Sequence, residues 1–162
     1  MLLEEFCNSL TDINKFQLAL KLIRAGMPAW KRFAAKGKLS YRDSVVWMKH
    51  EVDADILENA VQCAEKYFSE SEEKKKTKLL IEAENLLKEF EEPVTAMQDD
   101  DWKLPQAAEK FFYSVFNLLN ALTCPDDRAR YFYVSINQAI DAVESAGLLS
   151  EEEIKSILNT KP

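Results

Sequence analysis

Histidine, glycine and cysteine are scarce in this chain of 162 residues, which has one histidine, three glycines and three cysteines. Histidine supplies most metal ligation and much of the general base catalysis near neutral pH. The single His50 therefore excludes a two-histidine zinc helix and the paired Glu-x-x-His motifs of di-iron bundles. Three unclustered glycines also leave no phosphate-binding loop. We expect a protein that is not an enzyme and that holds no cofactor and no metal, with His50 on a helix surface or partly buried.

The three cysteines, Cys7, Cys63 and Cys124, form neither a Cys-x-x-Cys pair nor a metal-binding spacing with histidine. An odd number of widely spaced cysteines is typical of buried, reduced side chains in a reducing compartment. The first residues lack the basic start and the apolar run of a signal peptide, and no apolar stretch approaches the ~20 residues that span a bilayer. The sequence therefore predicts a cytoplasmic protein that does not bind membranes.

The composition is that of a globular protein with a negatively charged surface. Hydrophobic residues make up 47% of the chain and charged residues 30%, so there is enough apolar surface to form a core. The length suits one domain, residues 1–162. A formal net charge of -7 repels phosphate backbones and favours basic partners, so we expect no nucleic-acid binding.

Apolar residues recur every three or four positions between the glycines and prolines, which is the spacing that places them on one face of a helix. We see no convincing strand. Helices are expected over 12–25, 28–37, around 45–48, and over 53–68, 79–90, 105–122, 132–143 and 150–158, with caps at Thr11, at Ser40 with Asp43, and at Ser150 with Glu153. The sequence predicts an all-α fold, a single-domain antiparallel bundle of six to eight helices.

The segment 91–104 is the longest one without helical periodicity, and we interpret it as a loop. It gathers acidic side chains around one large aromatic, a combination that suits docking to a basic protein, because carboxylates steer basic partners and tryptophan is a favoured interface anchor. The candidate partner-binding residues are Glu91, Glu92, Asp99, Asp100, Asp101 and Trp102. In the commoner alternative, Trp102 covers the core and the aspartates cap the helix that opens at Pro105.

Two of the expected helices are rich in aromatic residues, and these lie on more than one face. The residues are Phe111, Phe112, Tyr113, Phe116, Tyr131, Phe132 and Tyr133. If they form a contiguous exposed patch, they mark an interaction site or a surface for self-association. Burial on both sides in the middle of the bundle is the commoner outcome.

Parts of the sequence resemble a bacterial helical family of unknown function, the YjaG-like family. The resemblance rests on the segment 28–33 (PAWKRF), on Asp101-Trp102 followed by Leu104-Pro105, and on the helix end 118–122 (LLNAL), and its order and spacing cover about two thirds of the chain. It implies a compact helical bundle without an assigned catalytic residue. Helical immunity proteins of bacterial toxin systems share this general style.

Three functions follow from these observations. The first is a binding module, most concretely an acidic immunity-type protein that binds and blocks a basic bacterial toxin surface through the residues of 91–102. The second is a structural or regulatory homo-oligomer assembled through the aromatic helices. The third is an enzyme that uses carboxylates alone, with a borrowed divalent ion.

Overall fold

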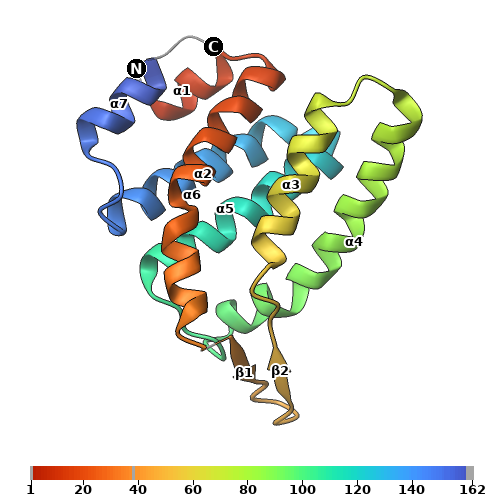
Figure 1. Cartoon of the computed structure of the whole chain (residues 1–162), viewed down its shortest axis with the longest axis vertical. Coiled ribbons are helices and arrows are strands. Elements are labelled where there is room, and N and C mark those ends of the chain that lie inside the picture. The colour runs from red at the N-terminus through yellow and green to blue at the C-terminus, as the bar shows by residue number, and fades with distance from the viewer. Residues whose placement is uncertain (1, 38, 160–162) are drawn as a thin grey trace.

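The computed structural model describes residues 2–37 and 39–159, and this part of the chain contains seven α-helices and one short β-hairpin (Figure 1). The elements are α1 (Leu3–Asn8), α2 (Asp12–Ala35), β1 (Ser40–Arg42), β2 (Lys49–Glu51), α3 (Ile56–Ser69), α4 (Glu73–Gln98), α5 (Gln106–Thr123), the 3-10 turn η1 (Pro125–Asp127), α6 (Arg128–Ser145) and α7 (Glu151–Asn159). The predicted all-α bundle is confirmed. The expectation that the chain has no strand is wrong.

Helix α5 is central to the bundle, because it contacts α2, α3, α4 and α6 (Figure 1). Its apolar residues spread around most of the helix, which is the pattern of a helix buried on several sides. The buried residues of α5 are Ala108, Phe111, Phe112, Ser114, Val115, Leu118, Leu119, Ala121 and Leu122. The aromatic-rich region expected from the sequence is therefore mostly core.

The seven aromatics of α5 and α6 form no exposed patch. Phe111, Phe112 and Phe132 are fully buried, and the other four, Tyr113, Phe116, Tyr131 and Tyr133, are half-buried and pack against the core. Burial in the middle of the bundle, the commoner of the two expected outcomes, is what the structure has.

Several predicted helix ends are confirmed. The Thr11 hydroxyl accepts a hydrogen bond from the Asn14 amide at 3.3 Å and caps α2. Ser150 and Glu153 form the predicted capping box of α7, with reciprocal hydrogen bonds of 2.6 and 3.1 Å. Helix α3 occupies the expected segment and buries its predicted apolar face.

We expected two helices, over 12–25 and 28–37, but the structure has one. Helix α2 continues through both Gly26 and Pro28. A proline within a helix costs about 3 kcal/mol. Apolar side chains on both sides of it, including Met27, Trp30 and Phe33, are buried in the core and outweigh that cost. Gly26 serves packing instead of ending a helix, since a Cβ there would lie 2.9 Å from the Phe111 ring.

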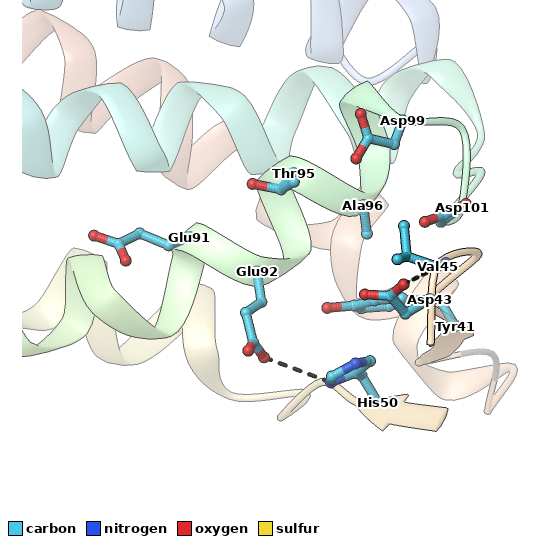
Figure 2. A pocket seen from close by; sticks show the side chains of 10 residues that line it. All are labelled: Tyr41, Asp43, Val45, His50, Glu91, Glu92, Thr95, Ala96, Asp99 and Asp101. Carbon is cyan, nitrogen blue, oxygen red and sulfur yellow. Dashed lines mark hydrogen bonds and ion pairs between the residues drawn. The ribbon is translucent and has the colours of Figure 1, made fainter. Parts of the chain in front are cut away.

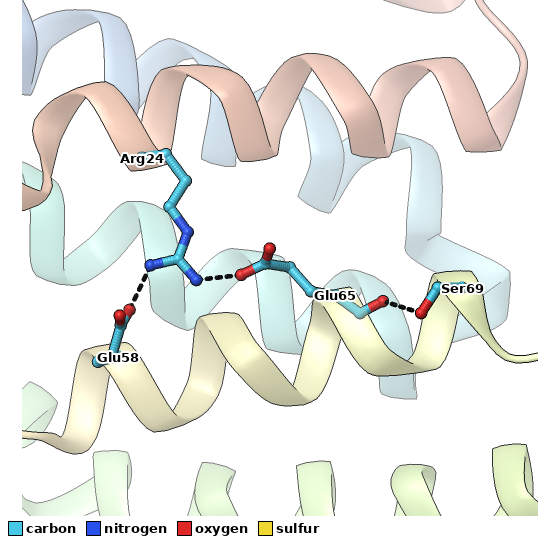
Figure 3. A network of polar contacts seen from close by, with 4 residues as sticks. All are labelled: Arg24, Glu58, Glu65 and Ser69. Atoms are coloured by element: carbon cyan, nitrogen blue, oxygen red, sulfur yellow. Dashed lines mark hydrogen bonds and ion pairs between the residues drawn. The ribbon is translucent and has the colours of Figure 1, made fainter.

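Arg24 ties α2 to α3 through two carboxylates (Figure 3). Its guanidinium donates hydrogen bonds to Glu58 and Glu65, which lie seven residues, or about two turns, apart on one face of α3. These hydrogen bonds, together with the carboxylate charges, raise the pKa of Arg24 against the opposing effect of burial. The network therefore joins α2 to α3, the helix that follows the hairpin in the chain.

No helix within residues 2–37 and 39–159 is both long and apolar enough to cross a membrane. Cys7 and Cys63 are buried, as predicted, whereas Cys124 is half-buried, and all three are free thiols.

Candidate protein-binding site

Most of the expected loop 91–104 is helical, because α4 continues through Pro93 to Gln98. Pro93, Val94, Ala96 and Met97 are buried and extend the apolar face of α4 past the proline. Packing therefore overrides the proline here, as it does in α2. Glu91 and Glu92 consequently project from a helix and not from a loop.

Three aspartates end α4 in a Schellman motif. Asp100 has φ 59°, the left-handed conformation that this helix end requires and that aspartate tolerates better than most residues. The Asp101 amide then donates to the Ala96 carbonyl at 2.8 Å, and the Asp100 amide donates to the Met97 carbonyl at 3.3 Å. This turn directs the Asp101 side chain toward the hairpin and the next residue, Trp102, into the core.

Trp102 is only 5% exposed, so it is unavailable as the exposed anchor that the docking interpretation required. Its ring stacks on Tyr41 at a centroid distance of 5.7 Å and meets Phe112 edge-on at 5.8 Å. Tyr41 also stacks on His50, its partner across the β-ladder, at 5.1 Å. Trp102 covers the core, as in the alternative we described, and it anchors the base of the hairpin. His50 lies on β2 and is half-buried, so of the two expectations for it, a partly buried side chain is what the structure has and a helix surface is wrong.

The segment 43–48, where we expected a helix capped by Ser40 and Asp43, is a turn between the strands. Asp43 Oδ1 accepts hydrogen bonds from the amides of Val45 and Val46 at 2.7 and 3.2 Å. The Trp47 amide donates to the Asp43 carbonyl at 2.8 Å, and the Asp43 amide donates to the Met48 carbonyl at 3.0 Å. These bonds hold Trp47 at φ 59°, which is unusual for a bulky side chain.

Two further contacts hold this turn. Asp101 Oδ2 accepts hydrogen bonds from both the amide and the hydroxyl of Ser44, each at 3.2 Å. Arg42 donates to the Trp47 carbonyl at 3.0 Å. None of the predicted aspartates caps α5 with its side chain, because the N-terminus of α5 has no side-chain cap.

The turn presents four consecutive apolar side chains to solvent, and we call residues 45–48 the hairpin tip. Val45 is 85% exposed, Val46 63%, Trp47 71% and Met48 59%. Only three other large apolar side chains are exposed in the described residues, and they are scattered: Leu2, Ile13 and Ile81. The tip is therefore the main exposed apolar surface of this part of the chain.

A hollow of about 320 Å³ opens between the hairpin and the C-terminal end of α4 (Figure 2). Its lining residues are Tyr41, Asp43, Val45, His50, Glu91, Glu92, Thr95, Ala96, Asp99 and Asp101. Five of these ten are carboxylates, and none is a lysine or an arginine, so we call this feature the acidic hollow. A neighbouring hollow of about 350 Å³ shares Tyr41, His50 and Glu92 with it.

The carboxylates of the acidic hollow differ in how they are held. Hydrogen bonds from the two amides at the tip lower the pKa of Asp43, so this side chain stays ionised. Glu92 lies 3.5 Å from His50 Nδ1 (Figure 2). Burial raises the pKa of Tyr41, and the charges of Glu92, Asp43 and Asp101 raise it further. An unbalanced negative charge thus lines a concave surface that suits cationic side chains.

The structure brings together four of the six predicted binding residues, since Glu91, Glu92, Asp99 and Asp101 line the acidic hollow. Asp100 lies outside it, exposed at the helix end, and Trp102 is buried behind it. Sequence reasoning missed Asp43 and the hairpin tip. The apolar run 45–48 was interpreted as part of a helix, although Asp43 followed by Ser44 is also a common turn sequence.

The acidic hollow is suited to ion pairing. Within the described residues, no group of three or more histidine, cysteine, aspartate or glutamate side chains is arranged to hold a metal ion. The comparisons with known proteins give no further guidance, because no family model, curated protein or solved structure matches the chain. The resemblance to the YjaG-like family therefore stays a prediction.

Proposed function

We propose that this protein is a non-catalytic binding module that docks a basic protein surface in the acidic hollow. The observation that carries the proposal is the gathering of five carboxylates from α4, its C-terminal turn and the hairpin around one concave surface that contains no lysine or arginine. Glu91 and Asp99 support it most directly, because no hydrogen bond or ion pair is found for either side chain within residues 2–37 and 39–159. They are available to a partner.

The most concrete form of this function is an immunity-type protein in the cytoplasm that blocks a basic toxin. The formal net charge of -7 supports it, because the field of the whole chain attracts a basic partner over distance and speeds association. Assembly through the aromatic helices has no comparable support, since those side chains pack into the core.

Co-expression with the products of neighbouring genes tests the proposal. We expect one basic product to stop bacterial growth when expressed alone and this protein to restore growth. The double variant Glu91→Lys, Asp99→Lys should lose the rescue. A matched control, Glu4→Lys with Glu152→Lys, changes the net charge equally at exposed positions on α1 and α7, at the end of the molecule opposite the hairpin (Figure 1), and it should keep the rescue. Equal rescue by both variants would refute the role of the hollow, and the absence of any toxic neighbour would refute the immunity function.

A further inference from the structure

The hairpin tip is an exposed apolar surface that the acidic hollow does not explain. Four of the seven exposed large apolar side chains in the described residues are consecutive in it, at positions 45–48. Scattered apolar residues are ordinary on a protein surface, whereas a contiguous projecting group marks an interaction site. Tryptophan and methionine are also enriched at the centres of interfaces. The tip therefore has the composition of an interface core.

The backbone of the tip is ordered before any partner arrives. Asp43 accepts hydrogen bonds from the first two tip amides, and Asp101 holds Ser44 from the end of α4. The base of the hairpin is fixed by Tyr41, which is buried against Trp102. A surface held in its bound conformation loses less conformational entropy on binding. This is an expected property of an anchor.

The tip and the acidic hollow form one continuous surface, because Val45 belongs to the tip and also lines the hollow. A partner that covers the tip must therefore also face the carboxylates. We propose that the hairpin tip is the apolar anchor of the binding site and inserts into an apolar patch on a partner protein that is bordered by arginine or lysine side chains. This inference rests on the proposed function, whose partner it describes more closely.

Charge also argues against two other occupants. A second copy of this chain would bring its own acidic hollow to the contact, and like charges that face each other oppose association. A lipid surface favours apolar tips surrounded by lysine and arginine. Here Lys49 is 3.9 Å from Glu51 and Arg42 is bound to a carbonyl of the turn, while the adjoining hollow is acidic.

Three synthetic peptides of equal length test the chemistry of the partner. One alternates arginine with leucine, one alternates arginine with serine, and one alternates glutamate with leucine. Their affinities for the whole protein are measured by calorimetry, and the contact is located by amide shifts in NMR spectra. We expect the arginine–leucine peptide to bind about tenfold more tightly than the arginine–serine peptide, because it alone covers both the tip and the hollow.

Two variants separate the tip from the hollow. Val45→Thr, Val46→Thr, Trp47→Asn and Met48→Gln together remove the apolar surface of the tip, and asparagine tolerates the left-handed backbone at position 47. This variant should bind the arginine–leucine peptide only as tightly as the arginine–serine peptide. Glu91→Lys with Asp99→Lys should weaken binding of both arginine peptides. Ile81→Thr, which changes an exposed apolar residue of α4 away from the site, should change neither. Thermal unfolding confirms that each variant is folded.

Each other outcome contradicts a distinct part of the argument. Equal binding of the two arginine peptides, unaffected by the tip variant, overturns the anchor and leaves the proposed function standing. Failure of both arginine peptides to bind overturns the proposed function and the anchor with it. Equal binding of the glutamate–leucine peptide overturns the charge requirement. If the protein binds phosphatidylcholine vesicles and the tip variant does not, the occupant of the tip is a membrane and not a protein. If light scattering shows dimers that the tip variant abolishes, the occupant is a second copy of this chain.

Discussion

Asp101 and Ser44 are 57 positions apart in the chain, yet one carboxylate oxygen of Asp101 accepts hydrogen bonds from both the amide and the hydroxyl of Ser44 at 3.2 Å. This contact joins the end of α4 to the turn of the hairpin. An acidic residue that we first considered as a partner contact therefore also positions the surface that we assign to the partner.

Removal of this carboxylate should loosen the turn. In Asp101→Ala the Ser44 amide loses its acceptor, which costs roughly 1 kcal/mol at an exposed site. Amide hydrogen exchange over residues 44–47, followed by NMR, should accelerate about fivefold, while exchange in α5 stays unchanged. Asp101→Asn retains an acceptor oxygen and is the matched control. Exchange rates that are the same in wild type and Asp101→Ala would show that the contact does not order the turn.

Truncation of Trp102 should destabilise the whole protein. The ring is buried between Tyr41 and Phe112, so Trp102→Ala leaves a cavity at the base of the hairpin and should cost about 3–5 kcal/mol of unfolding free energy. Trp102→Phe keeps an apolar ring and should cost clearly less. Urea denaturation followed by circular dichroism measures both. A loss below 1 kcal/mol in the alanine variant would contradict the burial of this side chain.

Gly26→Ala shows which of two opposing effects on stability is larger at this position, the higher helix propensity of alanine or the tight packing of α2 on α5. Alanine is better than glycine within a helix by about 1 kcal/mol. Its Cβ would lie 2.9 Å from Phe111 Cδ2, and this ring is fully buried in α5 and has little room to move. Overpacking of a core costs about 1–3 kcal/mol, so we expect a net loss of roughly 1 kcal/mol in urea denaturation. An increase in stability would show that α2 and α5 separate easily.

The proline and glycine positions show where prediction from the sequence succeeds and where it fails. Thr11 and Ser150 act locally, and the helix ends predicted from them are confirmed. Pro28 and Pro93 were interpreted as breaks, but their neighbours are buried against residues distant in the chain. Local propensity cannot reveal that compensation, because the compensating energy comes from tertiary contacts.

The candidate site was predicted only in part, and the reason is similar. The acidic composition of 91–101 is evident in the sequence, and four of these carboxylates do line one hollow. The hairpin tip was missed because a short apolar run fits a buried helix as well as an exposed turn. Its exposure depends on the pairing of Tyr41 with His50 and on the docking of Trp102, which are contacts between distant segments.

Cys63 should make stability depend on pH in the alkaline range. Burial raises the pKa of its thiol from 9.0 to about 11, and the nearby charge of Glu82 adds to this effect. The folded protein holds this proton more tightly than the unfolded chain does. The stabilisation of the folded protein by the protonated Cys63 thiol is therefore complete below pH 9. It is lost as the pH rises from 9 to 11, by roughly 1.4 kcal/mol of unfolding free energy for each pH unit.

Urea denaturation of the wild type and of Cys63→Ala at pH 8 and pH 10 measures the contribution of Cys63. The comparison removes the contributions of the tyrosines and lysines that also titrate in this range, because both proteins contain them. We expect the wild type to lose about 1 kcal/mol more than the variant over this interval. Equal losses would mean that the Cys63 thiol is accessible to solvent in the folded protein.

The left-handed backbone at Trp47 implies that this residue lowers the stability of the protein while it supplies surface for the proposed binding. A side chain with a Cβ costs about 1–2 kcal/mol in this conformation, and glycine avoids that cost. Trp47→Gly should therefore raise the melting temperature of the isolated protein, but it also removes the largest side chain of the hairpin tip. A laboratory selection for heat resistance alone would be expected to discard this tryptophan, whereas a selection that also demands binding of the proposed partner would retain it.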